Sequence, residues 1–198
     1  MKLFHASTSP YARKVMACAI ARGLDSQIEV ITTNPHLSPP ELLAANPLSK
    51  IPCLITTDGL ALFDSPVIVE YLDTLDGGMP LFPRSGGARL HALKQQAIAD
   101  GIMDAAVSRR MEQARPKEAA RDGVMLRHTQ AVARALDMLE RDPPSQTLDV
   151  GSISVACALG YLTLRFSDEP WREGHPKLAA WFAEFGLNPC IALTKPQA

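Results

Sequence analysis

The order of strand-like and helix-like segments constrains this 198-residue chain more than any other feature. Up to about residue 76, short apolar runs alternate with stretches of helical spacing. The predicted strands are 3–5, 28–31, 53–57 and 60–63, and the predicted helices are 10–22, 40–45 and 65–75. The last two strands face each other across Asp58-Gly59, a signal for a two-residue hairpin loop. This order predicts a small α/β domain.

Strand signals disappear in the second part of the chain. The segments 88–114, 122–140, 152–166 and 176–185 all have helical spacing and are rich in Ala, Leu, Met and Arg. We therefore predict a first domain over 1–78, a linker over 79–87 and an all-helical domain over 88–198. Asn188-Pro189 is expected to begin an irregular tail.

Charge and composition exclude several classes of partner. Twenty basic side chains balance twenty-one acidic ones, so the strongly basic surface that binds nucleic acid is absent from the sequence. No stretch approaches the roughly 18 apolar residues of a membrane span, and the first residues contain no signal-peptide core. We expect a cytoplasmic protein with neither a nucleic-acid nor a membrane partner.

The cysteines offer no metal or dithiol motif. Cys18, Cys53, Cys157 and Cys190 are far apart in sequence, and none belongs to a C-x-x-C pair. In a reducing compartment each is expected to be a small buried hydrophobic residue.

The segment Ser9-Pro10-Tyr11 joins the first strand to the first helix. Serine is favoured as a helix N-cap and proline at the first helical position. The free N–H groups and the positive end of the helix dipole favour an anion in front of Ser9, and a thiolate is such an anion. A plain helix cap is the alternative interpretation of the same residues.

Two further segments have the form of binding elements. Pro52 directly precedes a strand, and a cis Ile51-Pro52 bond would turn the Ile51 N–H and C=O outward for an extended peptide. Asp64-Ser65-Pro66 repeats the capped helix start, with Ser65 as the predicted N-cap, and offers an anion site beside a carboxylate. An ordinary trans proline and a bare capping pair are the alternatives.

Together, S-P-Y-A-R-K-V, N-P-L-S-K-I-P-C-L and F-D-S-P-V-I-V-E-Y-L resemble the glutathione S-transferase family. The resemblance continues into A-D-G-I-M-D-A and E-Q-A-R-P, similar to a little-characterised bacterial branch, and covers essentially the whole chain. It implies a thioredoxin-like N-terminal domain and an all-α C-terminal domain. It also implies a homodimer, glutathione as co-substrate, no other cofactor and no metal, and a function in detoxification.

The resemblance implies a set of site residues. Ser9 would lie near the glutathione sulfur, the Ile51 backbone would hold the cysteinyl unit, and Asp64 with Ser65 would hold the γ-glutamyl end. The next candidates are two residues of the loop after the second strand and one acidic helix residue that would act across a dimer interface: Asn34, His36 and Asp100. A solvated loop and a helix-face charge paired with Arg89 or Lys94 are the alternatives.

One family signature is incomplete in this sequence. The sixth helix of the family begins with a Ser or Thr cap followed three residues later by Asp. In this chain the residue three positions after Ser152 is Val155. The reciprocal capping-box contact is therefore predicted to be missing or replaced.

The residue at position 9 limits the chemistry. Glutaredoxins, which the N-terminal half also resembles, have Cys-Pro-Tyr-Cys where this chain has Ser9-Pro10-Tyr11-Ala12. Serine cannot form a mixed disulfide, so the remaining chemistry is hydrogen bonding from Ser9 that stabilises a glutathione thiolate. Ser7 and Thr8 are alternative donors, and Tyr11 is interpreted as a helix residue only.

The second substrate is expected to be a small, largely apolar electrophile bound between Ser9 and the helical domain. Met103, Val107 and Met111 share one predicted helix face, which is either the wall of that site or core. Arg109-Arg110 would attract an acidic substrate or form a solvated face. A non-catalytic glutathione-binding scaffold, and a glutathione-dependent peroxidase, lyase or isomerase, remain alternative functions.

Overall fold

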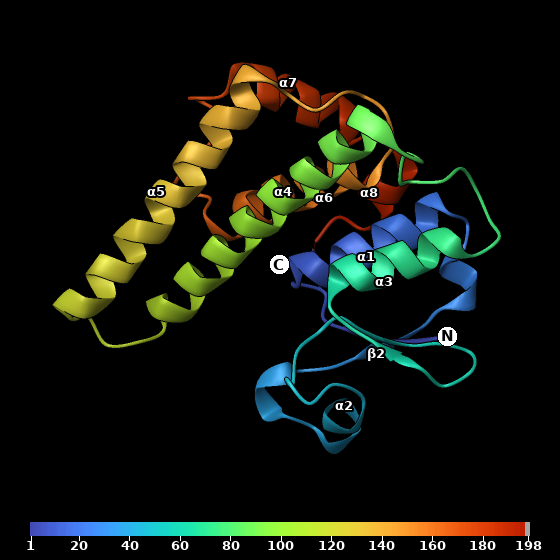
Figure 1. The fold of residues 1–198 in the computed structure, drawn as a ribbon. Helices are drawn as coiled ribbons and strands as arrows, with labels where there is room; N and C mark the ends of the chain where they lie inside the picture. Colours follow the sequence, from blue (N-terminus) through green and yellow to red (C-terminus); the bar gives the residue numbers. More distant parts are fainter. Residues whose placement is uncertain (197–198) are drawn as a thin grey trace.

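The computed structural model describes residues 1–196 and has a thioredoxin-like α/β part followed by an all-helical part (Figure 1). The strands are β1 Lys2–His5, β2 Glu29–Thr32, β3 Cys53–Ile55 and β4 Ala61–Leu62. The helices among them are α1 Pro10–Ala21, α2 Pro40–Ala45 and α3 Ser65–Thr74, with short 3-10 turns at Asp25–Gln27 and Pro35–Leu37. The predicted fold class is confirmed.

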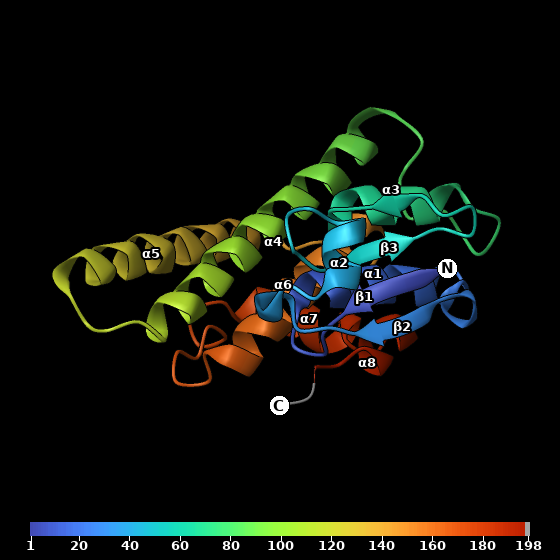
Figure 2. The same cartoon turned by 90° about the horizontal axis from the view of Figure 1, so that it is seen from below.

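The four strands form a single mixed sheet in the order β2-β1-β3-β4. β1 runs parallel to β2 and antiparallel to β3, and β4 is antiparallel to β3. Because successive side chains of a strand point to opposite faces, Leu3 enters the main core while Phe4 packs with Leu42 of α2. The ribbon places α1 and α3 on one side of the sheet and α2 on the other (Figures 1 and 2).

The hairpin loop between β3 and β4 is one residue longer than the predicted two-residue loop. β3 and β4 do pair, but Ile55 lies opposite Ala61, and the N–H of Thr56 donates to the carbonyl of Leu60. The loop therefore contains three residues, 57–59. Gly59 has a φ of 88°, and a left-handed residue at the last loop position is typical of three-residue hairpins.

The helical part contains α4 Gly86–Gln113, α5 Ala119–Arg141, α6 Val150–Arg165, α7 Pro176–Phe185 and α8 Pro189–Leu193. Every residue of α6 from Val150 to Leu162 is buried, so this helix forms the centre of the packing. None of the helices described in residues 1–196 is both long and apolar enough to span a bilayer.

The irregular tail predicted from Asn188 is wrong. Residues 189–193 form a short helix that starts at Pro189, because Cys190 and Ile191 are buried in the main core. The Nη2 atom of Arg13 donates to the carbonyl of Ile191 at 3.2 Å and so joins α1 to this helix.

The capping box of α6 is present with its partners reversed. Asp149 is the N-cap and accepts from the N–H of Ser152 at 2.9 Å, while the Ser152 hydroxyl accepts from the N–H of Asp149 at 3.1 Å. The sequence analysis took Ser152 as the cap residue, but Ser152 is the third residue of the helix. The contact is therefore replaced by an equivalent one.

Candidate functional site

The sheet register brings the loops that contain the predicted site residues to one edge. His5 lies opposite Thr32 in the parallel pair, and Phe4 lies opposite Cys53 in the antiparallel pair. The C-terminal ends of β1, β2 and β4 therefore share an edge with the N-terminal end of β3. The segments that begin or end there carry Ser9, Asn34, Ile51 and the pair Asp64-Ser65.

Ser9 is the N-cap of α1, as predicted. It has extended backbone angles (φ −80°, ψ 120°), and its Oγ accepts from the N–H of Ala12 at 3.3 Å. A serine hydroxyl has two lone pairs and one proton, so this contact leaves the O–H free to donate. Ser9 is half-buried, whereas Ser7 is exposed and Thr8 is half-buried. The cap contact distinguishes Ser9 from its two neighbours.

The Ile51-Pro52 peptide bond is cis, and the alternative of an ordinary trans proline is wrong. The loop before it is held by Asn46, whose side chain is 1% exposed. Its Nδ2 donates to the carbonyl of Lys50 at 2.8 Å, and its Oδ1 accepts from the N–H of Leu48 at 3.0 Å. This buried amide fixes the backbone that leads into the half-buried Ile51.

The start of α3 differs from the prediction in its capping residue. Asp64, not Ser65, is the N-cap, and no side-chain capping bond is formed. Ser65 is the first residue of the helix and is 2% exposed, whereas Asp64 is exposed and has no ion-pair partner among residues 1–196. The first N–H groups of the helix and an unpaired carboxylate therefore lie side by side.

Comparison with known proteins shows the family of the chain. The first part of the chain, residues 8–75, matches the glutathione S-transferase N-terminal domain, and residues 104–184 match the C-terminal domain of the same family. The chain is 33% identical to the uncharacterised GST-like protein YibF of Escherichia coli, over 99% of this chain and 98% of that protein. The chain belongs to the glutathione S-transferase family.

Solved structures agree with the family assignment. A glutathione transferase family member from Pseudomonas fluorescens Pf-5, with bound glutathione, is 40% identical and superposes with a TM-score of 0.93, covering 100% of this chain and 99% of that one. A second structure from that organism contains S-(propanoic acid)-glutathione, at 40% identity and a TM-score of 0.90, with 100% of both chains covered.

In this transferase family member, Asn34 and His36 lie in the loop after β2. Asn34 caps the 3-10 turn by accepting from the N–H of His36 at 3.1 Å, and both side chains are exposed. Asn34 also lines a cavity of about 450 Å³ between the sheet and the segment leading into α2. None of the other predicted site residues lines this cavity. Asn34 therefore makes a local capping contact, and within residues 1–196 the His36 side chain forms neither a hydrogen bond nor an ion pair.

Asp100 forms an ion pair with Lys14 of the same chain. The Nζ of Lys14 is 2.6 Å from Oδ1 of Asp100, and the lysine side chain is fully buried. Burial raises the pKa of Asp100, and Asp104 and Asp64 also raise it, against the opposing effect of Lys14. The predicted alternative, a pair with Arg89 or Lys94, is wrong, because Asp100 pairs with Lys14 and Arg89 pairs with Glu70.

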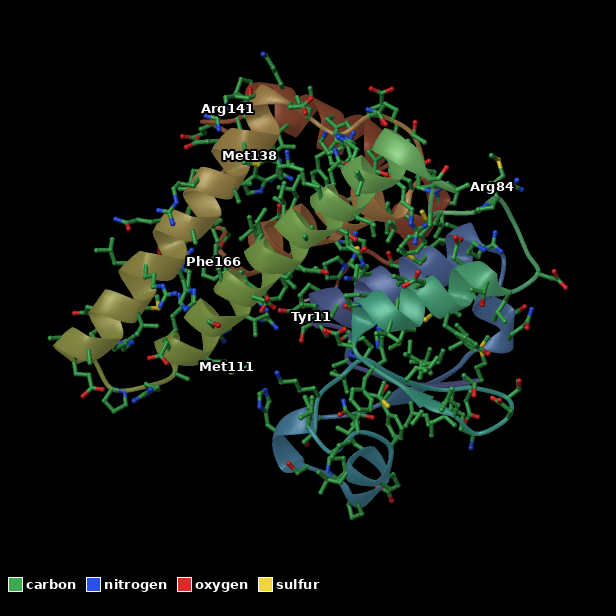
Figure 3. All side chains as sticks on the ribbon, viewed as in Figure 1. Tyr11, Arg84, Met111, Met138, Arg141 and Phe166 are labelled. Atoms are coloured by element: carbon green, nitrogen blue, oxygen red, sulfur yellow. The ribbon has the colours of Figure 1, made fainter. Side chains whose placement is uncertain are left out.

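Tyr11 makes a contact that the sequence analysis missed. Figure 3 labels Tyr11 in the first turn of α1. Its hydroxyl donates to Oδ1 of Asp104, which joins this turn to the middle of α4. Burial raises the pKa of Tyr11 most, and the bond to Asp104 raises it further, so the phenol stays protonated. Nothing in the sequence pairs two residues that are 93 positions apart.

The three residues of the predicted apolar face on α4 differ in how deeply they are buried. Met103 is fully buried and belongs to the core, Val107 is half-buried, and Met111 is 45% exposed. Only the C-terminal part of the predicted face is therefore accessible to a second substrate. Among residues 1–196, no group of three or more His, Cys, Asp or Glu side chains is arranged to hold a metal ion.

Proposed function

We propose that the protein binds glutathione and activates its thiol as a thiolate, which attacks a small, largely apolar electrophile. The observation that carries this proposal is the capped start of α1. Ser9 accepts from Ala12 N–H and keeps its own proton for a sulfur in front of the helix. The positive end of the helix dipole favours the thiolate at the same position.

The expected gain follows from the ionisation of a thiol. A thiol with a pKa near 8.5 is only a few per cent ionised at pH 7, so lowering its pKa by about two units increases the thiolate more than tenfold. The thiolate forms the new C–S bond directly, without a covalent enzyme intermediate. Detoxification of electrophiles in the cytoplasm is the proposed setting.

The other predicted residues complete the glutathione site in this proposal. The Ile51 backbone pairs with the cysteinyl unit, Asp64 accepts from the γ-glutamyl ammonium, and Ser65 with the start of α3 holds the carboxylate. Asn34 and His36 are the candidates for the glycine end. The proposal keeps the domain division at 1–78, 79–87 and 88–198, a homodimer, and Asp100 as a ligand candidate.

Two solved structures of one relative support this choice of ligand. One solved structure at 40% identity contains glutathione, and another at 40% identity contains S-(propanoic acid)-glutathione. The second ligand is a thioether of glutathione, the chemical class that thiolate attack on carbon produces.

The proposal is tested by following thiolate absorbance in the ultraviolet against pH, with glutathione bound to the wild type and to Ser9→Ala. We expect the thiol pKa to be lowered in the wild type and to return by at least one unit in the variant. Ser7→Ala and Thr8→Ala are the matched controls and should keep the lowered pKa. Binding with an ordinary thiol pKa would indicate a non-catalytic glutathione-binding protein, and absence of binding would contradict the proposal.

A further inference from the structure

A second cavity, of about 270 Å³, lies where α1, the edge strand β2 and the end of α8 come together (Figure 2). Its lining combines the end of β1 and the loop after it with α1, β2 and residues 193–195. Ser9, Ile51, Asp64 and Ser65 are not among the lining residues. The cavity is therefore distinct from the candidate glutathione site.

The polar part of this lining is positively charged. It consists of His5, Ser7, Arg13, Thr194 and Lys195, and no carboxylate lines the cavity. Arg13 and Lys195 each carry a positive charge, and neither forms an ion pair among residues 1–196. The neighbouring Lys14, in contrast, is neutralised by Asp100. The cavity therefore has two positive charges in its lining and no counter-ion.

Arg13 is the buried charge of this cavity, with 5% of its surface exposed. Its Nη2 donates to the carbonyl of Ile191 at 3.2 Å, while Nε and Nη1 are buried without a hydrogen-bond partner. The carbonyl is a neutral acceptor for one of the five N–H groups of the guanidinium. This contact explains how the side chain is held, but it leaves the positive charge uncompensated. A buried charge without a counter-ion is costly, and an anion in the cavity would reduce that cost.

Two donors of the lining are accessible and unoccupied. Ser7 and Lys195 are exposed, and neither the hydroxyl nor the ammonium forms a hydrogen bond among residues 1–196. The Thr194 hydroxyl, in contrast, already donates to the carbonyl of Cys190 at 2.6 Å. An anion can therefore bind to Ser7 and Lys195 directly, while the Arg13 charge attracts it from below the surface.

The rest of the lining is apolar. It consists of Met16 and Ile20 of α1, Val30 of β2 and Leu193 of α8. The volume of about 270 Å³ is slightly below the range of about 300–1,000 Å³ that is typical of sites for drug-sized ligands. The cavity therefore fits a small anion, with apolar surface beside it for a short organic group.

We infer that this cavity binds a phosphate group, as free phosphate or as a small phosphate monoester. Phosphate carries close to two negative charges near neutral pH, which matches the charges of Arg13 and Lys195. The donors come from the loop after β1, from α1 and from the segment after α8, so they approach from different sides. A tetrahedral group accepts from such directions, whereas a carboxylate accepts mainly in its own plane.

Binding of phosphate would connect two distant segments. Ser7 precedes Ser9 by two residues, and Lys195 follows α8. Because the folded cavity is needed to bring these side chains together, phosphate should stabilise the folded protein and raise its melting temperature. This inference is independent of whether glutathione is a substrate.

Calorimetry in phosphate-free buffer at constant ionic strength tests the site, with inorganic phosphate and phenyl phosphate as probes. Lys195→Gln should weaken the binding of both about tenfold, the effect of one charge-assisted hydrogen bond. Arg13→Gln should weaken it at least as much, and glutamine keeps an N–H group for the Ile191 carbonyl. Since Lys195 is exposed, its variant remains informative if Arg13→Gln does not fold.

Lys117→Gln is the matched control, because Lys117 is an exposed residue of the loop between α4 and α5 and does not line the cavity. It should leave both affinities unchanged. Tighter binding of phenyl phosphate than of phosphate would identify a monoester as the ligand, and equal binding would identify free phosphate. Benzoate, which has the same ring and a single negative charge, should bind at least tenfold more weakly than phenyl phosphate.

Saturating glutathione separates this site from the proposed function. It should leave the affinity for phosphate unchanged, because the two sites share no lining residue. Phosphate binding that glutathione abolishes, that Lys195→Gln does not change or that benzoate equals would overturn the inference, as would the absence of phosphate binding. If phosphate binds as expected but glutathione does not bind, the phosphate site stands and the proposed function fails.

Discussion

The hydroxyl of Ser9 has to serve the helix and the ligand at the same time. Its oxygen accepts from Ala12 N–H at 3.3 Å, and its proton is the donor proposed for the glutathione sulfur. Removing the hydroxyl by Ser9→Ala therefore also removes a helix cap, at a cost of about 1 kcal/mol. Ser9→Thr keeps both contacts, so it separates a loss of thiol activation from a loss of fold stability.

The ion pair between Lys14 and Asp100 is the residue-scale contact with the largest expected effect on stability. The lysine side chain is fully buried, and its ammonium pairs with Asp100. Asp100→Asn should lower the free energy of unfolding by about 3 kcal/mol, because it leaves a buried ammonium uncompensated. Lys14→Met with Asp100→Asn should recover most of that loss. Urea unfolding of the wild type and of both variants measures these differences.

Asp76→Asn is the control, because Asp76 is exposed in the loop after α3 and should change stability by less than about 0.5 kcal/mol. If Asp100→Asn were as stable as the wild type, the ammonium would have another partner. A stable double variant also allows glutathione affinity to be measured without Asp100, which tests its predicted role as a ligand.

At the scale of the elements, the sequence predicts helix starts better than helix partners. Pro10, Pro40 and Pro176 each begin a helix as predicted, because proline at the first position depends on local backbone angles alone. The order of strands and helices along the chain also predicts the thioredoxin-like fold. In that fold the loops of the candidate site lie at one edge of the sheet. The contacts Lys14–Asp100 and Tyr11–Asp104 join positions 86 and 93 residues apart, so no local pattern contains them.

The capping box of α6 shows how a local pattern can also mislead. Ser152 is 1% exposed, and its hydroxyl accepts from the N–H of Asp149 and donates to the carbonyl of Thr147 at 2.6 Å. The family pattern places the hydroxyl before the carboxylate, whereas this chain has the carboxylate first. The N–H groups of Asp149 and Ser152 are satisfied in either order. A sequence pattern that requires the hydroxyl first therefore does not detect this capping box.

Ser152→Ala should lower the free energy of unfolding by about 2 kcal/mol, because it leaves the Thr147 carbonyl and the Asp149 N–H without this partner. Ser154→Ala is the matched control. The Ser154 hydroxyl is equally buried but bonds, within residues 1–196, only to the Val150 carbonyl of its own helix, so its loss should cost less than about 1 kcal/mol. Equal losses in urea unfolding would show that the box adds nothing beyond burial of a hydroxyl.

At the scale of the whole molecule, α1 connects the sheet to the helical part. Its residues Arg13 and Lys14 are both buried, the first beside Gly160 of α6 and the carbonyl of Ile191 in α8, the second against Asp100 of α4. The residues that position Ser9 therefore belong to the same helix that holds the two parts together. A change at this interface should affect both stability and the thiol.

Gly160→Ala tests this interface. A Cβ at that position would overlap Nη1 of Arg13 and lie 3.2 Å from its Cζ. Arg13 is 5% exposed and bonded to Ile191, so the guanidinium has little room to move. We expect Gly160→Ala to lower the free energy of unfolding by about 1 kcal/mol, since overpacking costs more than the gain in helix propensity.

Gly123→Ala on α5 is the control, because a Cβ there meets no atom within 4 Å. It should raise the free energy of unfolding by roughly 0.5 kcal/mol. Opposite shifts of the two urea midpoints are the expected result, and a gain at both positions would mean that Arg13 is not confined between α1, α6 and α8.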